Sequence, residues 1–369
     1  MTAPAPGSAA KTSDSPAPNP AAKRKQATWK TTLQYTLGIG LAVGLLTYAL
    51  MELDWEQAVK EMQGVNWLML LLSLVAGLTS HVLRGYRWSM LLKAAQSPVP
   101  PSNAFAATLL GYGVNNIVPR LGEVARFGIL VRTDNLKIAA GAGTVVTERS
   151  IDMLTALLMV GFMFLFEMDT LLNLFAEQGL KQPLSGVAST WLLVLLVLVG
   201  LLGLYVFYRY HQFFLRFKLY EKVYGFVRQV LEAVLSIRHL ERAGLFVFYS
   251  IGIWAMYVTM WYFMLQAFPL TAGLNFYFAF LLTNFGTLAM LLPAPGGAGT
   301  FQIASAYMFM AFGAPYGMGY EDGLLLGTLA HLPHYVLNTL VGGLGYLYLL
   351  FKTPKRPYSE AEAALDDLD

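Results

Sequence analysis

The sequence contains no cysteine and few charged residues, and both shortages limit what the protein can be. Without cysteine, the chain can form no disulfide, no thiolate metal site and no cysteine nucleophile. Only 13% of its residues are charged, whereas a soluble domain carries about 25%. Because 56% of the residues are hydrophobic, much of this apolar surface must be covered by lipid. The composition therefore indicates a membrane protein.

Several chemical signals are also missing from the sequence. A net charge of +3 is too small and too scattered to suggest a nucleic-acid-binding protein. The five histidines form no HExxH or similar pattern, and no Walker or dinucleotide-binding motif occurs. We therefore assign no catalytic residue, no metal and no cofactor, and expect a transporter-like protein rather than an enzyme.

The apolar sequence lies between two tails of different composition. Residues 1–30 are rich in Ala, Pro, Ser and Asn, carry a basic cluster, and are expected to form a disordered basic tail. Residues 353–369 are expected to form an acidic C-terminal tail. The chain between them, residues 31–352, is expected to fold as one membrane domain.

Six apolar stretches are long enough to cross a membrane, which takes about 20 residues in a helix. These stretches are 31–51, 65–83, 138–166, 188–208, 243–268 and 324–351. In lipid the backbone must satisfy its own hydrogen bonds, so the sequence predicts an all-α polytopic fold with about six spanning helices.

Two further apolar stretches are interrupted near their middle. Residues 103–131 are broken at Val118-Pro119-Arg120, and residues 274–313 are broken at the sequence LPAPGG. Each pattern predicts a re-entrant hairpin, in which two short helices enter the membrane and return to the same side. Irregular backbone at this depth is tolerated only where it packs in protein or lines a wet cavity.

The charges of the loops support this count of spans. With the N-terminus inside, basic residues dominate every expected inner loop, and acidic residues dominate the outer loops. A hairpin that crossed the membrane would exchange the sides of all later loops. Both termini are therefore expected on the cytoplasmic side of the membrane. The halves 31–166 and 188–351 then have opposite orientation, as in transporters built from inverted repeats.

Charged residues gather in NNIVPRLGEVARFGIL (115–130) and in TERSID (147–152). Charges at membrane depth cost roughly 2.5–3.5 kcal/mol each on insertion scales, and they normally pair or mark a pathway. The spacing of Arg120, Glu123 and Arg126 predicts one shared helix face. The two asparagines before the break can cap or bond freed backbone. The substrate-binding candidates in these stretches are Asn115, Asn116, Arg120, Glu123, Arg126, Glu148, Arg149 and Asp152.

Two interpretations of these charges remain open. In the first, the arginines meet the phosphate of a ligand, while the acids serve as counter-charges. In the second, the charges form an ion-pair network that only locks the hairpin to the neighbouring span. Charge balance alone does not require a bound anion.

The second interrupted stretch carries no charge but is rich in glycine. Gly296, Gly297, Gly299 and Gln302 are substrate-binding candidates here, because free amides at a helix start can hold a phosphate. A plain helix break explains the same residues equally well.

Two pairs of residues are secondary candidates. Arg84 and Arg87 close an expected span, where they either snorkel to the membrane interface or contact a phospholipid headgroup. His331 and His334 lie one turn apart in the last expected span. They can relay protons, bind a headgroup or form hydrogen bonds within the packed core.

Four stretches of the chain together resemble the lysylphosphatidylglycerol synthase transmembrane family. They are LRGYRWSMLL (83–92), NNIVPRLGEVARFGIL (115–130), TVVTERSIDML (144–154) and LPAPGGAGTFQ (292–302), in the family's order. The resemblance covers roughly residues 31–352. It implies an inner-membrane protein that moves lipids between leaflets or assists lipid-linked synthesis. Two-part members add a soluble synthase domain, which is expected to be absent here, so aminoacyl transfer is not carried over.

The family's short patterns map onto particular residues. The P-x-R-x-G-E pattern fits only in part, at Pro119-Arg120-Leu121-Gly122-Glu123, whereas E-R-x-x-D and P-G-G-x-G match Glu148, Arg149, Asp152, Pro295, Gly296, Gly297 and Gly299. Members commonly carry a Glu shortly after these glycines, where this chain has Gln302. This difference argues against any mechanism that needs an acid in the second hairpin.

The sequence therefore predicts a flippase-like lipid translocase with a polar cavity near the membrane midplane. Its substrate would be a phospholipid or a polyprenyl-linked lipid. The alternative is a membrane partner or enzyme of polyprenyl-linked sugar synthesis, which would work with a synthase or glycosyltransferase. A scaffold without transport is a third hypothesis, and the sequence predicts no oligomeric state.

Overall fold

The structure is a computed structural model that describes residues 42–177 and 235–352, together with Thr36, Gly40, Tyr224, Gly225, Arg228, Leu231 and Glu232. The elements below all belong to the compact unit Gly38–Asp369. The regular structure of the described residues is entirely helical, as predicted. The expected span 188–208 and both expected tails lie outside these residues.

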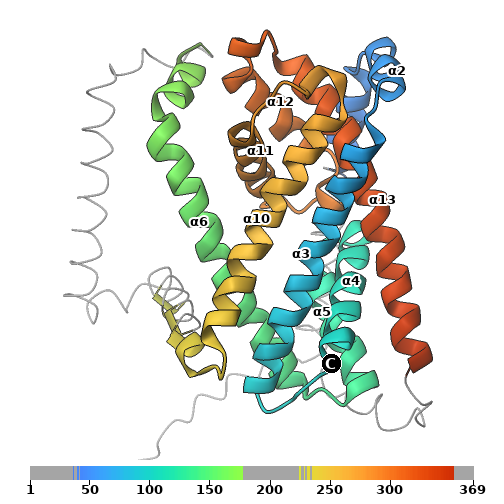
Figure 1. The fold of residues 1–369 in the computed structure, drawn as a ribbon, viewed down its shortest axis with the longest axis vertical. Helices are drawn as coiled ribbons and strands as arrows, with labels where there is room; N and C mark the ends of the chain where they lie inside the picture. Colours follow the sequence, from blue (N-terminus) through green and yellow to red (C-terminus); the bar gives the residue numbers. More distant parts are fainter. Residues whose placement is uncertain are drawn as a thin grey trace, which may run out of the picture. The chain divides into compact units, whose positions relative to one another are not determined.

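The described helices up to α6 follow one another with short connections, and so do those from α10 onward (Figure 1). After a short apolar helix, Ala42–Met51, they are α2 (Trp55–Gln63), α3 (Trp67–Ala94), α4 (Pro101–Ile117), α5 (Gly122–Asp134), α6 (Ile138–Glu177), α10 (Ala243–Ala267), α11 (Phe276–Ala289), α12 (Thr300–Phe312) and α13 (Tyr320–Lys352). Four short 3-10 turns lie between them: η1 (Ile237–His239), η2 (Pro269–Thr271), η3 (Pro295–Gly297) and η4 (Ala314–Tyr316).

Four of the described helices are long and apolar enough to cross a membrane. They are α3, α10, α13 and the Ile138–Met168 part of α6, which match four of the six predicted spans. Their outer faces expose large apolar side chains such as Leu71, Leu158, Phe248 and Leu344, as expected for surfaces that contact lipid. Of the first predicted span, only the Ala42–Met51 helix is described.

Both predicted breaks separate two short antiparallel helices. In the first hairpin, α4 and α5 are joined at their far ends by a 2.6 Å hydrogen bond from Asn103 Nδ2 to Asp134 Oδ1. In the second hairpin, α11 and α12 face each other through the rings of Phe278 and Phe309, whose centroids lie 5.0 Å apart. Proline and glycine therefore mark the ends of the helices correctly in both stretches.

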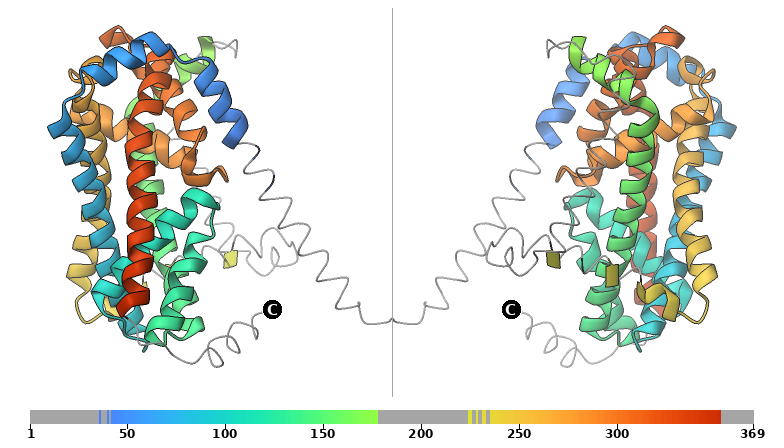
Figure 2. Two further views of the ribbon diagram at one scale, coloured as in Figure 1. Left: turned by 90° about the vertical axis from the view of Figure 1, so that its right-hand side faces the viewer. Right: turned by 90° about the vertical axis from the view of Figure 1, so that its left-hand side faces the viewer.

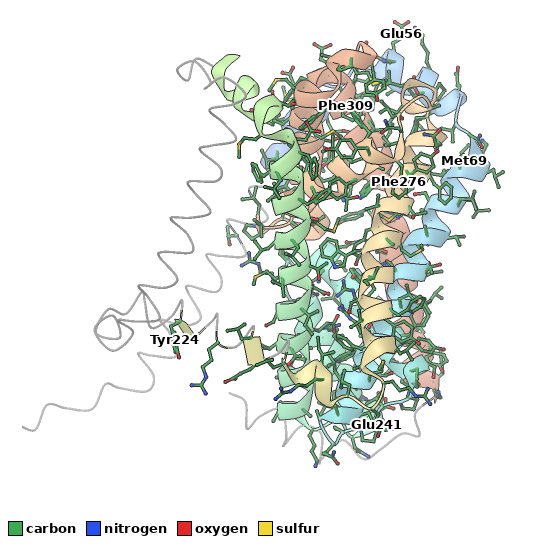
Figure 3. All side chains as sticks on the ribbon, turned by 60° about the vertical axis from the view of Figure 1, so that its left-hand side comes forward. Glu56, Met69, Tyr224, Glu241, Phe276 and Phe309 are labelled. Atoms are coloured by element: carbon green, nitrogen blue, oxygen red, sulfur yellow. The ribbon has the colours of Figure 1, made fainter. Side chains whose placement is uncertain are left out.

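The two hairpins approach from opposite ends of the helical unit (Figures 1 and 2). The first lies at the end that carries Lys93 and Lys352, which we call the Lys93 end; Lys352 Nζ donates to Asn103 Oδ1 at 2.9 Å. The second lies at the Glu61 end, where Glu61 Oε2 accepts from the amide of Leu270 at 2.9 Å. Figure 3 places Glu241 at the first end and Glu56 at the second.

The tips of the two hairpins contact each other through an exposed hydrogen bond. Arg120 Nη2 donates to the carbonyl of Leu291 at 3.2 Å. Asn116 Nδ2 donates to Tyr335 O and to Thr339 Oγ1, both at 2.9 Å, which fixes the first tip to α13. His331 Nε2 lies 3.0 Å from the carbonyl of Gly296, so α13 also contacts the second tip.

Small residues let α4 lie directly against α13. A Cβ atom on Gly342 would come within 2.7 Å of Gly113 Cα, and one on Gly345 would come within 2.5 Å of the carbonyl of Ala106. Close backbone approach of this kind is how helices associate in lipid, where there is little hydrophobic force between them.

The prediction that Arg120 shares a helix face with Glu123 and Arg126 is wrong, because Arg120 is not part of that helix. Helix α5 begins only at Gly122, and Arg120 has a left-handed backbone with φ +65°. The chain turns at Pro119 and Arg120, and Asn115 Oδ1 then accepts the amide hydrogen of Gly122 at 2.7 Å. This last contact agrees with the prediction that the asparagines bond freed backbone.

Candidate functional site

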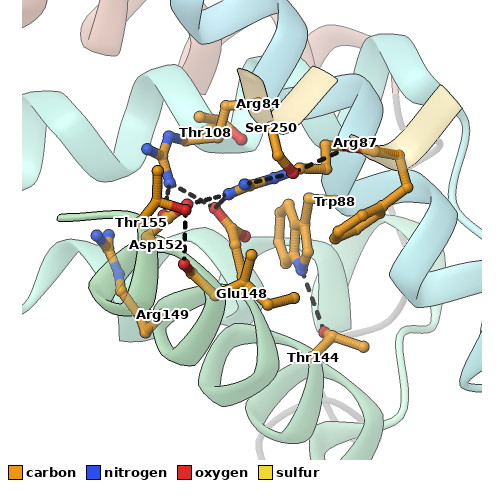
Figure 4. Close-up of polar contacts among 12 residues, drawn as sticks. Arg84, Arg87, Trp88, Thr108, Thr144, Glu148, Arg149, Asp152, Thr155 and Ser250 are labelled. Carbon is orange, nitrogen blue, oxygen red and sulfur yellow. Dashed lines mark hydrogen bonds and ion pairs between the residues drawn. The ribbon is translucent and has the colours of Figure 1, made fainter. Parts of the chain in front are cut away.

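Five charged side chains from three helices form one buried cluster, of which Figure 4 shows Arg84, Arg87, Glu148 and Asp152. We call it the ion cluster; its members are Arg84 and Arg87 of α3, Arg126 of α5, and Glu148 and Asp152 of α6. Arg87 and Glu148 have no exposed surface, and none of the five is more than 7% exposed. The spacing along each helix explains the arrangement, since i, i+3 and i, i+4 pairs share one face.

Glu148 and Asp152 each contact more than one guanidinium group. Arg84 Nη1 lies 2.8 Å from Glu148 Oε1 and also pairs with Asp152 Oδ2. Arg87 Nη2 lies 2.6 Å from Asp152 Oδ1 and 3.4 Å from Glu148 Oε1. The second carboxylate oxygen of Glu148 lies 2.9 Å from Arg126 Nη2, as an ion pair without hydrogen-bond geometry. Helix α6 is therefore held to α3 and α5 through its acids.

The ion cluster contains three guanidinium groups and two carboxylates, which leaves one positive charge in excess. In addition, the Nε atoms of Arg84, Arg87 and Arg126 are buried without a hydrogen-bond partner. Unpartnered buried donors cost free energy, and a buried charge costs more when it lacks an opposite charge. The cluster therefore has both the charge and the free donors to bind an anion.

Arg84 and Arg87 do not snorkel to the membrane interface, so that interpretation is wrong. Helix α3 continues past the expected span end at residue 83 to Ala94, and this places both arginines inside the protein. Glu148 follows Arg84 by 64 positions, and Asp152 follows Arg87 by 65. No local pattern around residue 84 reveals partners at such a distance along the chain.

A second ion pair lies beside the cluster but is more exposed. Arg149 of α6 pairs with Glu123 of α5, and their side chains are 46% and 24% exposed. Arg120 lies apart from both sets, at the tip of the hairpin. The structure therefore joins the charged sequence candidates in two adjacent groups and leaves Arg120 outside them.

Polar aromatic residues extend the ion cluster toward α13. Arg84 Nη2 donates to Tyr257 OH at 3.1 Å, and this hydroxyl lies 3.1 Å from Tyr112 OH. The ring of His81 stacks on Tyr112 with centroids 4.0 Å apart, and His81 Nε2 lies 3.0 Å from Asn338 Oδ1. None of these polar aromatic residues is among the sequence candidates. His81 lies one turn before Arg84, which is a usable signal, but nothing local identifies the tyrosines.

Candidates in the second hairpin take part in local structure. Gly296, Gly297 and Gly299 have left-handed φ angles of +55°, +78° and +80°. Gln302 Oε1 accepts the amide hydrogen of Gly299 at 2.8 Å and so caps α12. The amide of Gly297 bonds the carbonyl of Ala294. The amides of Gly297 and Gly299, which were predicted to bind a phosphate, therefore already have hydrogen-bond partners within the protein.

The two candidate histidines bond different neighbours. His331 contacts the carbonyl of Gly296, and His334 Nε2 lies 3.0 Å from Ser73 Oγ on α3. Within the described part of the chain, no group of three His, Asp or Glu residues is placed to hold a metal ion.

Comparison with known proteins agrees with this architecture. The chain is 21% identical over 319 residues to a UPF0104 membrane protein of Methanothermobacter thermautotrophicus, and the match covers 84% of this chain and 90% of the relative. No solved structure matches the chain. The family described as lysylphosphatidylglycerol synthase TM region matches residues 35–342. The chain therefore belongs to the lysylphosphatidylglycerol synthase transmembrane family.

Proposed function

We propose that the protein is a lipid translocase that moves a phospholipid or a polyprenyl-phosphate lipid between leaflets. One observation carries this proposal, namely the buried ion cluster with its single excess positive charge. Phosphate is the common anion of these headgroups, and arginine binds it well through paired N–H donors. A membrane protein that only needed structural ion pairs would gain nothing from an unbalanced charge at this depth.

The way α6 is attached supports a moving part. Only 17% of its spanning window is buried inside the described fold, the same share as for α10, compared with 39% for α3 and for α13. Its links to α3 and α5 include the ion pairs of Glu148 and Asp152. In our proposal, a phosphate replaces these carboxylates on the arginines while α6 moves away from α3, and the acyl chains stay in the bilayer.

The proposal includes an inverted repeat with about six spans in the cytoplasmic membrane. The opposite approach of the two hairpins and the basic residues at the Lys93 end support it. Single cysteines test the orientation on this cysteine-free chain. Ser102→Cys and Glu321→Cys should react with an impermeant maleimide from opposite sides of the membrane, and the first should be cytoplasmic. Reaction of both from one side would overturn the repeat.

Leaflet exchange in liposomes tests the function itself. The purified chain is reconstituted with fluorescent phospholipids or polyprenyl phosphates, and dithionite quenching follows their movement. Arg126→Gln removes the excess charge, and we expect it to slow exchange about 10-fold, or about 1.4 kcal/mol in the barrier. Lys60→Gln, at the opposite end and fully outside the cluster, is the control. The exchange rate is compared among vesicles with the wild type, vesicles with Arg126→Gln and protein-free vesicles. If the three rates are equal for fluorescent phospholipids and also for polyprenyl phosphates, the protein is not a translocase.

A further inference from the structure

A cleft of about 1210 Å³ opens at the Lys93 end of the protein. It lies between the last turns of α3, the first turns of α6 and the start of α10. Sites for small molecules usually have volumes of about 300–1000 Å³, so this cleft can hold a larger group. None of the sequence candidates for substrate binding lines it.

The rim of the cleft is basic. Lys93 and Arg242 lie on it together with Glu241, which gives a local excess of one positive charge. Lys93 Nζ donates to Glu241 Oε2 at 2.7 Å, and this hydrogen bond lowers the pKa of the Glu241 carboxyl. Because the Lys93 and Glu241 side chains are 62% and 73% exposed, the pair can open to admit an anion.

The walls of the cleft are amphipathic. Hydroxyl groups come from Ser89 and Thr147 on facing helices, whereas Met90 and Leu245 supply apolar surface. Gly143 of α6 also lines the cleft, and a Cβ atom on it would meet nothing within 4 Å. Such a surface suits a molecule with a polar, anionic head and an apolar remainder.

Trp88 contacts both a residue that lines the cleft and an arginine of the ion cluster. Thr144 lines the cleft, and its Oγ1 accepts a hydrogen bond from Trp88 Nε1 at 3.1 Å (Figure 4). On its other side, the Trp88 ring lies 4.5 Å from Cζ of Arg126. The indole is fully buried, so Trp88 is a packed link between Thr144 and Arg126.

We infer that this cleft binds the anionic phosphate headgroup of a membrane lipid, with Lys93 and Arg242 as its contacts. The inference rests on the proposed function for its substrate class. It concerns occupancy at the membrane surface and not transfer, so the two can fail separately. Thr144 and Trp88 would then connect a lipid bound here with Arg126 of the ion cluster.

Protection of a single cysteine tests the inference. Gly143→Cys places a thiol in the open space of the cleft, and Gly244→Cys is the matched control. Gly244 is also at the Lys93 end and has nothing within 4 Å of its Cβ position, but it does not line the cleft. The full chain is reconstituted in phosphatidylcholine vesicles with or without phosphatidylglycerol, and an uncharged maleimide measures the labelling rate.

We expect phosphatidylglycerol to slow labelling of Gly143→Cys at least about threefold, as for a site that is two-thirds occupied, and to leave Gly244→Cys unchanged. Adding Lys93→Gln and Arg242→Gln should remove the protection. Equal protection by soluble glycerol phosphate in phosphatidylcholine vesicles would overturn the assignment to a lipid. Equal labelling of Gly143→Cys in both vesicles would overturn the site, whatever the exchange assay shows.

Discussion

The two hairpins have the same outline but are held in place by different forces. The first presents Glu123 and Arg126 to α6 and is fixed there by ion pairs. The second has no charged residue between Phe276 and Phe312, and it is fixed by aromatic packing and by glycines with left-handed backbone. Ion pairs can exchange one partner for another, whereas packed rings and strained turns have one arrangement. In our proposal, ligand exchange therefore takes place at the first hairpin, and the second serves as a fixed framework.

The largest effect should come from the acid that most arginines share. Glu148→Gln leaves three buried guanidinium groups with one carboxylate, because Glu148 contacts Arg84, Arg87 and Arg126. We expect a loss of about 3–5 kcal/mol in unfolding free energy, as is typical when a buried pair loses one partner. Thermal unfolding in detergent measures it, with the exposed Glu56→Gln as control. Equal stability of the two variants would show that the ion cluster does not hold the first hairpin.

A somewhat smaller effect should follow from crowding the second tip. Gly296→Ala combines a φ of +55° with a Cβ atom 2.5 Å from Asn116 Oδ1, and hydrogen bonds to α13 hold that amide in place. We expect a loss of about 2–4 kcal/mol from left-handed strain plus overpacking.

Gly317→Ala is the matched control for this substitution. Its φ is +71°, yet nothing lies within 4 Å of its Cβ position. It should lose only about 1 kcal/mol, from strain alone. If both alanine variants unfold at the same temperature, the tip is not tightly packed and the contrast between the hairpins is wrong.

The smallest effect should come from the ion pair on the outer side of the first hairpin. Arg149 and Glu123 are partly exposed, and such pairs contribute about 1 kcal/mol or less. A double-mutant cycle with Arg149→Gln and Glu123→Gln measures their coupling by unfolding. The same cycle on Arg126 and Glu148 gives the coupling inside the ion cluster for comparison. If the two couplings are equally large, Arg149 and Glu123 belong to the ion cluster.

Much of the fold could be predicted from local sequence. Apolar runs identified α3, α6, α10 and α13, and the residues Pro119 and Pro295 identified the two tips, because proline and glycine act on the backbone where they stand. The hydrogen bond from Asn115 to the amide of Gly122 is local as well, because only seven positions separate the two residues.

The centre of the site could be predicted only in part. TERSID and Arg126 were recognised as charged groups at membrane depth, but Arg84 and Arg87 were placed at the interface. Hydropathy predicts that a spanning helix ends at the first arginine in the sequence. In the folded protein, an acid that is distant along the chain can pair with this arginine, and the helix then stays buried beyond it. Tyr257 reaches Arg84 from α10, which no spacing along the chain predicts.

Both tips are bonded to the same helix, and that has a mechanical consequence. His331 holds the second tip and Tyr335 holds the first, four positions apart on α13. Between them lies Pro333, which has no N–H to bond the carbonyl one turn earlier. A bend of α13 at this proline would move one tip relative to the other and would strain the hydrogen bond from Arg120 to Leu291 that joins them. Both hairpins are therefore bonded to α13 at the place where its backbone lacks a hydrogen bond.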